Sequence, residues 1–146
     1  MRLLIPVVPL VLCFATACDS NSRPGAEAAS LAGAYELDRG EAGCFLNTEA
    51  MADARLHVQV SCFGGPPANN SGGAEDTVAV QDGEAVVRME YAGPCELRFR
   101  FHGDSARVRQ TGSDSDCGFG HGVTAGGAYR RVSRDPDFTK YLPNAP

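Results

Sequence analysis

Alternation of apolar and polar residues, broken at short intervals by turn-forming residues, limits most strongly what this chain can fold into. Residues 55–62 show it most clearly, with Leu, Val, Val and Cys on one face and Arg, His, Gln and Ser on the other. A period of two is typical of half-buried strands. Similar runs predict eight short strands, at residues 31–37, 44–50, 55–62, 75–81, 84–91, 95–101, 106–111 and 123–132.

These strands predict one all-β antiparallel domain, because short strands joined by tight turns form barrels or sandwiches. Residues 33–35 read Gly-Ala-Tyr, and so do residues 127–129. We therefore expect the first and last strands to pair and close an eight-stranded up-and-down barrel, which removes the sheet's free edges. A β-sandwich is the alternative. Outside the first 17 residues we find no apolar pattern with a helical period.

The first 17 residues predict a signal peptide. Arg2 precedes an apolar stretch, residues 3–17, that is shorter than the roughly 20 residues of a membrane-spanning helix. The end of this stretch, Ala-Thr-Ala before Cys18, fits an ordinary cleavage site and also resembles a bacterial lipobox, in which the cysteine is acylated. Both interpretations cut the same bond, so they differ only in the fate of Cys18.

The number of cysteines favours acylation. The chain has 6 Cys, and removing the leader with Cys13 leaves an odd number in an oxidising compartment. If Cys18 carries a lipid, four cysteines remain and can form two disulfides. These four are Cys44, Cys62, Cys95 and Cys117. We therefore expect an exported lipoprotein held in the inner or outer membrane through Cys18; the alternative is a secreted protein with a free or intermolecularly bonded Cys18.

The composition divides the chain into four segments. Residues 1–17 form the signal peptide, and residues 18–30 are polar enough to form a lipidated flexible tether. Residues 31–133 form the barrel domain. Residues 134–146 form a Pro-containing tail, for which the sequence leaves open whether it packs on the barrel or stays loose.

A hairpin centred on Asp53 would place Cys44 directly opposite Cys62. Residues opposite each other in an antiparallel pair are close enough for a disulfide. The register thus favours a Cys44–Cys62 bond and leaves Cys95 to bond with Cys117. Four cysteines allow three pairings, so the other two stay open.

A second hairpin predicts an unusual grouping of charge. A turn at residues 102–105 places Arg98 opposite Arg109 and Arg100 opposite Arg107 on the outer face. Like charges directly opposite each other are unfavourable in a sheet. In a chain of net charge −5, these arginines predict a docking face for an acidic envelope protein, a phosphate-bearing glycan or a lipid headgroup. The alternative is a solvated face neutralised by neighbouring glutamates, namely Glu84, Glu90 and Glu96.

Other chemistry has little support. The net charge of −5 argues against nucleic acid as a partner, because binding phosphates requires positive charge. His57, His102 and His121 fall on a strand, a turn and a loop, with no nucleophile or carboxylate placed beside them by the sequence. The chain has no CxxC pair, and Asp114 and Asp116 lack the later Glu and central Gly of an EF-hand. We expect no enzyme activity, no metal site and no cofactor.

The C-terminal third carries a recognisable pattern, CxLxFxF from Cys95, CGFGxGV from Cys117 and GxYR from Gly127. The pattern resembles a widespread group of small exported bacterial proteins, often lipidated. The resemblance implies a small calycin-like β-barrel in the cell envelope or periplasm, and it implies no reaction or ligand. The expected function is therefore a membrane-anchored, non-catalytic binding module. An inhibitor of a cell-wall hydrolase, similar to lysozyme inhibitors, is the alternative, although their Ser-Gly-x-x-Tyr loop is not found here.

Overall fold

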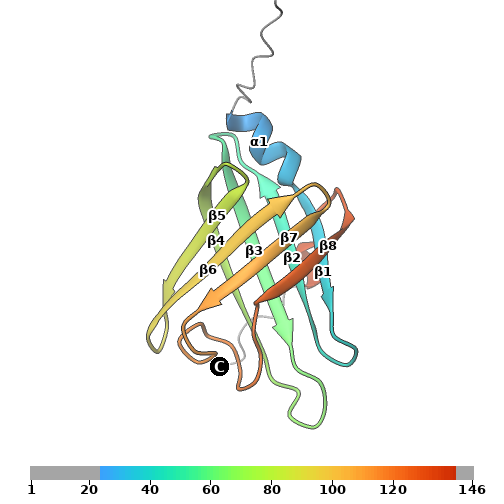
Figure 1. The fold of residues 1–146 in the computed structure, drawn as a ribbon, viewed down its shortest axis with the longest axis vertical. Coiled ribbons are helices and arrows are strands. Elements are labelled where there is room, and N and C mark those ends of the chain that lie inside the picture. Colours follow the sequence, from blue (N-terminus) through green and yellow to red (C-terminus); the bar gives the residue numbers. More distant parts are fainter. Residues whose placement is uncertain (1–23, 141–146) are drawn as a thin grey trace, which may run out of the picture.

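The computed structural model describes residues 24–140 and confirms the predicted all-β fold. Every strand pairs antiparallel with the next along the chain, and the last pairs with the first, so the sheet closes into an eight-stranded up-and-down barrel (Figure 1). The strands are β1 (Gly33–Asp38), β2 (Gly43–Ala50), β3 (Arg55–Phe63), β4 (Ser71–Gln81), β5 (Glu84–Glu90), β6 (Pro94–His102), β7 (Ser105–Thr111) and β8 (Gly127–Ser133). A helix, α1 (Pro24–Leu31), precedes them, and a 3-10 turn, η1 (Phe138–Lys140), follows.

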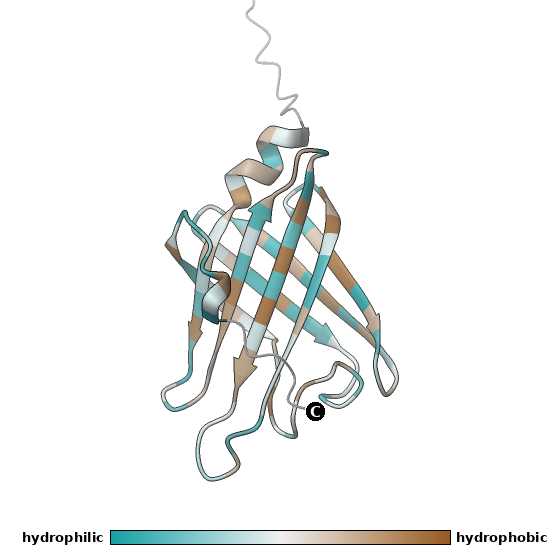
Figure 2. Cartoon of the chain, turned by 180° about the vertical axis from the view of Figure 1, so that it is seen from behind, coloured by the Kyte–Doolittle hydropathy of each residue, from teal (hydrophilic) through white to brown (hydrophobic). Residues whose placement is uncertain are grey.

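The interior of the barrel is filled by side chains. Figure 2 shows apolar and polar residues alternating along the strands, as the period of two requires (Figure 2). The largest fully buried side chains include Tyr35, Tyr129, Phe99, Leu46 and Leu56. Each such side chain stabilises the fold by about 1.5–3 kcal/mol relative to leaving it in water, so this core is the main source of stability.

Both predicted hairpin registers are confirmed. Cys44 pairs with Cys62 across β2 and β3, and Phe99 pairs with Val108 across β6 and β7. The two disulfides are Cys44–Cys62, with Cα atoms 4.0 Å apart, and Cys95–Cys117, with Cα atoms 5.0 Å apart. The second disulfide fastens the long connection between β7 and β8 to the start of β6.

Two strands begin four residues away from their predicted starts, and the other strand ends differ from prediction by two residues at most. β4 begins at Ser71 and not at residue 75. Gly72 allows this, because a Cβ atom there would lie only 2.6 Å from the Cα atom of Phe119. β8 begins at Gly127 and not at residue 123. The intervening residues are held instead by a side chain, since the N–H of Ala125 donates to Gln110 Oε1 at 2.9 Å.

The prediction of a flexible, non-helical segment up to residue 30 is wrong for its last part, which forms α1. Residues 24–31 carry Ala at three positions, and Ala is the strongest helix former. Pro24 stands at the first helical position, where its missing N–H costs nothing. Ala28 is 0% exposed and Leu31 8% exposed, so the helix packs one side onto the core at the end of the barrel.

The barrel also satisfies the polar groups of α1. The carbonyl of Leu31 accepts hydrogen bonds from the Tyr35 hydroxyl at 2.9 Å and from Thr48 Oγ1 at 2.7 Å. At the other side of the barrel end, Glu27 Oε1 accepts from the N–H of Gly83 at 2.5 Å. The last carbonyls of a helix have no partner inside it, so the contacts of the Leu31 carbonyl fix where α1 ends. The Glu27 contact adds a second point of attachment and fixes how α1 lies across the barrel (Figure 1).

The described part of the C-terminal segment packs on the outer face of the sheet. Asn47 donates from Nδ2 to the carbonyl of Asp137, and Asn47 Oδ1 accepts from the N–H of Asp137, each at 2.8 Å. Phe138 stacks on the ring of His57 with centroids 5.0 Å apart. Residues 134–140 therefore behave as a strap across β2 and β3, which settles what the sequence left open for these residues.

Candidate anion-binding groove

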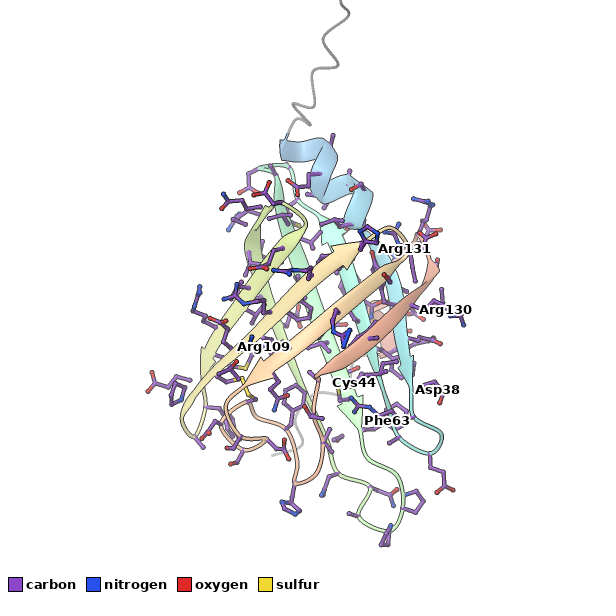
Figure 3. All side chains as sticks on the ribbon, in the orientation of Figure 1. Asp38, Cys44, Phe63, Arg109, Arg130 and Arg131 are labelled. Carbon is purple, nitrogen blue, oxygen red and sulfur yellow. A yellow bond between two sulfur atoms is a disulfide. The ribbon has the colours of Figure 1, made fainter. Side chains whose placement is uncertain are left out.

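The four arginines singled out from the sequence lie on two adjacent strands, as predicted. Arg98 pairs with Arg109, and Arg100 pairs with Arg107, in the ladder between β6 and β7. The residues between them, among them Phe99, point into the core. Alternation along a strand therefore turns all four guanidinium groups outward. Figure 3 labels one of them, Arg109.

Two of these arginines are neutralised by glutamates, as the alternative interpretation expected. Arg98 forms ion pairs with Glu84 and, at 2.8 Å, with Glu96. Arg100 reaches the other oxygen of Glu84 at 2.9 Å. Arg88 adds a contact to Glu96 at 3.1 Å, so the ion pairs form a network across β5 and β6.

The pKa directions agree with this network. Hydrogen bonds from Arg100, and next from Arg98, hold the pKa of Glu84 below its ordinary value. A hydrogen bond from Arg98 likewise lowers the pKa of Glu96. The same carboxylates, Glu96 first, raise the pKa of Arg98. The network thus stays fully charged at neutral pH and leaves Arg98 little capacity to bind another anion.

Arg107 and Arg109 differ from the other two. Both are exposed, and no carboxylate in residues 24–140 forms an ion pair with either. Glu90, the third glutamate considered as a neutralising group, also forms no ion pair within that part of the chain. The structure therefore divides the predicted docking face into a neutralised half on β6 and a charged half on β7.

A groove of about 480 Å³ runs beside the charged half. Its lining includes all four arginines together with Gln110 and Thr124, and no carboxylate of residues 24–140 contributes to it. A concave surface with one sign of charge concentrates oppositely charged ligands. The groove is therefore suited to an acidic group, with Arg107 and Arg109 free to bind it.

The far wall of the groove is built by contacts that sequence reasoning did not find. Gln110 Oε1 accepts from Thr124 Oγ1 at 3.1 Å, which holds the segment before β8 against β7. Arg39, on the turn after β1, donates from Nη1 to the carbonyl of Thr124 at 3.1 Å and from Nη2 to that of Gly126. The two Arg39 contacts join residues 85 or more positions apart, so no local pattern predicts them.

The other polar groups considered from the sequence form structural contacts. His57 Nε2 lies 2.8 Å from Glu75 Oε1 on the outer face of the barrel. Asp116 accepts from the hydroxyl and N–H of Ser113, and these bonds lower its pKa. Asp114 Oδ2 accepts from the N–H of Gly122 at 3.0 Å. Within residues 24–140 no three His, Cys, Asp or Glu side chains come together in a way that could hold a metal ion.

Comparison of the chain with models of known protein families, with curated proteins and with solved structures gave no match. None of the helices between residues 24 and 140 is long and apolar enough to cross a membrane. Cys18 and the predicted leader lie outside the described residues.

Proposed function

We propose that this chain is a membrane-anchored lipoprotein of the bacterial envelope whose barrel binds an acidic partner, without catalysing a reaction. Cys18 carries the lipid, and the groove beside Arg107 and Arg109 binds the partner. The partner presents carboxylate or phosphate groups, as an acidic protein, a phosphate-bearing glycan or a lipid headgroup would.

One observation carries the docking proposal: an acidic chain keeps Arg107 and Arg109 exposed and unpaired in a groove whose described lining has no carboxylate. Glutamates neutralise the arginines next to them on β6, so neutralisation was available to this sheet and does not extend to β7. Cross-strand repulsion among like charges is relieved when an anion binds between them.

The anchoring proposal is supported by the leader pattern and by the position of α1. Cys18 precedes Pro24 by six residues, which span at most about 20 Å. A lipid on Cys18 would keep the α1 end of the barrel near the bilayer. The groove lies on the side wall of the barrel, where an envelope component could reach it.

The docking proposal is tested by affinity capture from envelope extract with three versions of the full chain. One is unmodified, one carries Arg107→Gln and Arg109→Gln, and one carries Arg55→Gln and Arg134→Gln. The last pair removes the same charge from exposed positions away from the groove. Circular dichroism checks that all three are folded.

The proposal expects a partner that the unmodified chain and the Arg55/Arg134 variant retain and that the Arg107/Arg109 variant loses. Binding should also weaken as salt rises, because exposed charges are screened. If all three versions capture the same set, or none captures anything, the groove is not the docking surface.

A further inference from the structure

The ladder of the barrel is nearly interrupted between β4 and β5. These strands have 11 and 7 residues. Only Val80 with Ala85 and Gln81 with Glu84 are paired between them. On their other sides, β4 pairs with all of β3, and β5 pairs with β6 along its whole length. Figure 1 shows the two strands together near α1 and apart toward the opposite end of the barrel (Figure 1).

The wide end of this opening is filled by the connection between β7 and β8. The N–H of Gly120 donates to the carbonyl of Ser71 at 3.2 Å, and Phe119, 4% exposed, packs beside Gly72. Between that plug and the two paired positions, residues 75–79 of β4 and 86–90 of β5 have no pairing with each other. We call this stretch the β4–β5 seam.

The seam presents backbone groups that a strand can bind. Gln81 and Glu84 flank a two-residue turn with positive φ at Asp82 and Gly83, so they form the hydrogen-bonded pair that closes the hairpin. Backbone direction alternates along an antiparallel strand, so the N–H and C=O of Ala79 also point toward the seam. The N–H of Thr77, two residues further along, donates to its neighbour Asp76 Oδ1 at 2.7 Å in place of a strand partner.

Asp76 shows that the seam admits solvent. It lies opposite Val58, which is 1% exposed, and therefore belongs to the inward-facing set of β4. Asp76 is nevertheless exposed, and no basic side chain within residues 24–140 forms an ion pair with it. A cavity of about 700 Å³ opens at the hairpin end of the seam, lined from both strands by Val78, Ala79, Val86 and Arg88 among others.

We propose that the β4–β5 seam binds an extended peptide segment of a partner protein, which adds as a strand along β4 and places a basic side chain beside Asp76. Main-chain hydrogen bonds to an exposed strand edge supply affinity, and alternate side chains supply specificity. Here the inward-facing side chains along the edge are apolar at Val78 and acidic at Asp76. The strand edge of β4 is distinct from the exposed arginines of β7, although Arg100 lines the cavity on each side.

A second copy of this chain fits the seam less well. In the register that puts Glu75 opposite Asp76, antiparallel pairing of β4 with its own copy would bring the acidic residues of both strands together. Like charges opposite each other destabilise a sheet, whereas a peptide with lysine or arginine relieves the charge.

The experiment uses a fluorescein-labelled octapeptide, blocked at both ends, in which valine and lysine alternate along one face of the strand and threonine occupies the other face. It is titrated into the full chain by fluorescence anisotropy. We expect saturable binding that Asp76→Asn weakens by about fivefold, the upper range for an exposed ion pair. Asp135→Asn is the matched control: it removes the same charge from an exposed position that lines neither the seam nor its cavity, and should leave binding unchanged. The same peptide with glutamate for lysine should not bind.

Amide hydrogen exchange on the unmodified chain tests the strand pairing without relying on a variant. The Ala79 amide, which points into the seam, should exchange more slowly with the peptide bound, and the Val78 amide, which pairs with β3, should not change. The proposal is overturned by no saturable binding at about 1 mM peptide. Equal binding to the Asp76→Asn variant, or binding without protection of Ala79, also overturns it. If sedimentation shows a dimer, and the Ala79 amide is protected in that dimer, a second copy of the chain occupies the seam. This result would overturn the proposal that a partner's peptide binds there.

Discussion

Single side chains connect parts of this barrel that are far apart in sequence, and Arg131 is the clearest case. Its side chain is 5% exposed beside α1 (Figure 3). Nη2 donates to the carbonyl of Ser30 at 2.9 Å and to that of Gly103 at 3.1 Å, and the guanidinium lies 5.1 Å from the centroid of the Tyr35 ring. One residue thus joins the end of α1, the β6–β7 turn and the strand pair that closes the barrel.

Replacing Arg131 with methionine should therefore destabilise the fold. The substitution leaves the carbonyls of Ser30 and Gly103 without this donor, and we expect a loss of about 2–3 kcal/mol in the free energy of unfolding. Arg130→Met is the matched control, because Arg130 is exposed on the same strand, and it should change stability by no more than about 0.5 kcal/mol. Urea unfolding measures both, and equal effects would contradict the assigned role of Arg131.

Tyr129 should make stability depend on pH in the alkaline range. Burial raises the pKa of its hydroxyl, which donates to the carbonyl of Ala125 at 2.8 Å. The unfolded chain therefore ionises first: stability is complete below the ordinary tyrosine value near 10 and falls as pH rises above it. Tyr129→Phe should make this fall less steep by roughly 1.4 kcal/mol per pH unit, measured by urea unfolding between pH 10 and 12. An unchanged slope would show that Tyr129 ionises normally.

At the scale of elements, turns explain what could be predicted and long-range contacts explain what could not. The registers of Cys44 with Cys62 and of Phe99 with Val108 were predictable because a short turn fixes how two strands pair. Of the predicted docking arginines, the sequence located all four, but only the structure separates Arg107 and Arg109 from the neutralised pair. The glutamate contacts depend on side-chain reach, which strand pairing alone does not determine.

The missed elements have specific physical causes. α1 has no helical apolar period because its buried face needs only Ala28 and Leu31 to cover the end of the barrel. Its signals were the leading Pro24 and the alanine content. The early start of β4 depends on Gly72 lying against Phe119, and the late start of β8 depends on Gln110, so neither could be inferred from neighbouring residues.

The Cys95–Cys117 disulfide should stabilise the element that plugs the seam. Changing both cysteines to serine opens a loop of 22 residues and should cost about 3 kcal/mol on chain-entropy grounds. The amide of Gly120, which bonds to Ser71, should then exchange faster. Changing Cys44 and Cys62 is the control, because their strands stay paired along β2 and β3 and the Gly120 amide should be unaffected. Faster exchange at Gly120 in the control alone would contradict this assignment.

At the scale of the whole molecule, the fold has one end tied to α1 and an opposite end made of loops (Figure 1). The connections after β1, β3, β5 and β7 all lie at that loop end. If Cys18 carries a lipid, the loop end points away from the bilayer, and both proposed surfaces lie on the side wall between the two ends. Anchoring and binding are then performed by separate parts of the chain.

Removing the acylation site should release the protein from membranes. The full-length chain with Cys18→Ser should move to the soluble envelope fraction, because the lipid on Cys18 is what we propose holds the protein in the membrane. Circular dichroism should show that its barrel is intact. The unmodified chain should stay with membranes, and mass spectrometry of its N-terminal peptide should show an acylated cysteine. Identical partition of the two chains would contradict anchoring through Cys18.

The most direct test of the account is photocrosslinking from the rim of the groove in intact bacteria. Ala128 is exposed and lies opposite Arg107 in the ladder, so a benzophenone amino acid there faces the proposed partner. The same probe at Glu49, exposed on β2, is the control. The account predicts a crosslinked adduct from position 128 that Arg107→Gln with Arg109→Gln abolishes and Arg55→Gln with Arg134→Gln preserves. Equal adducts from both positions, or an adduct that survives loss of Arg107 and Arg109, would contradict it.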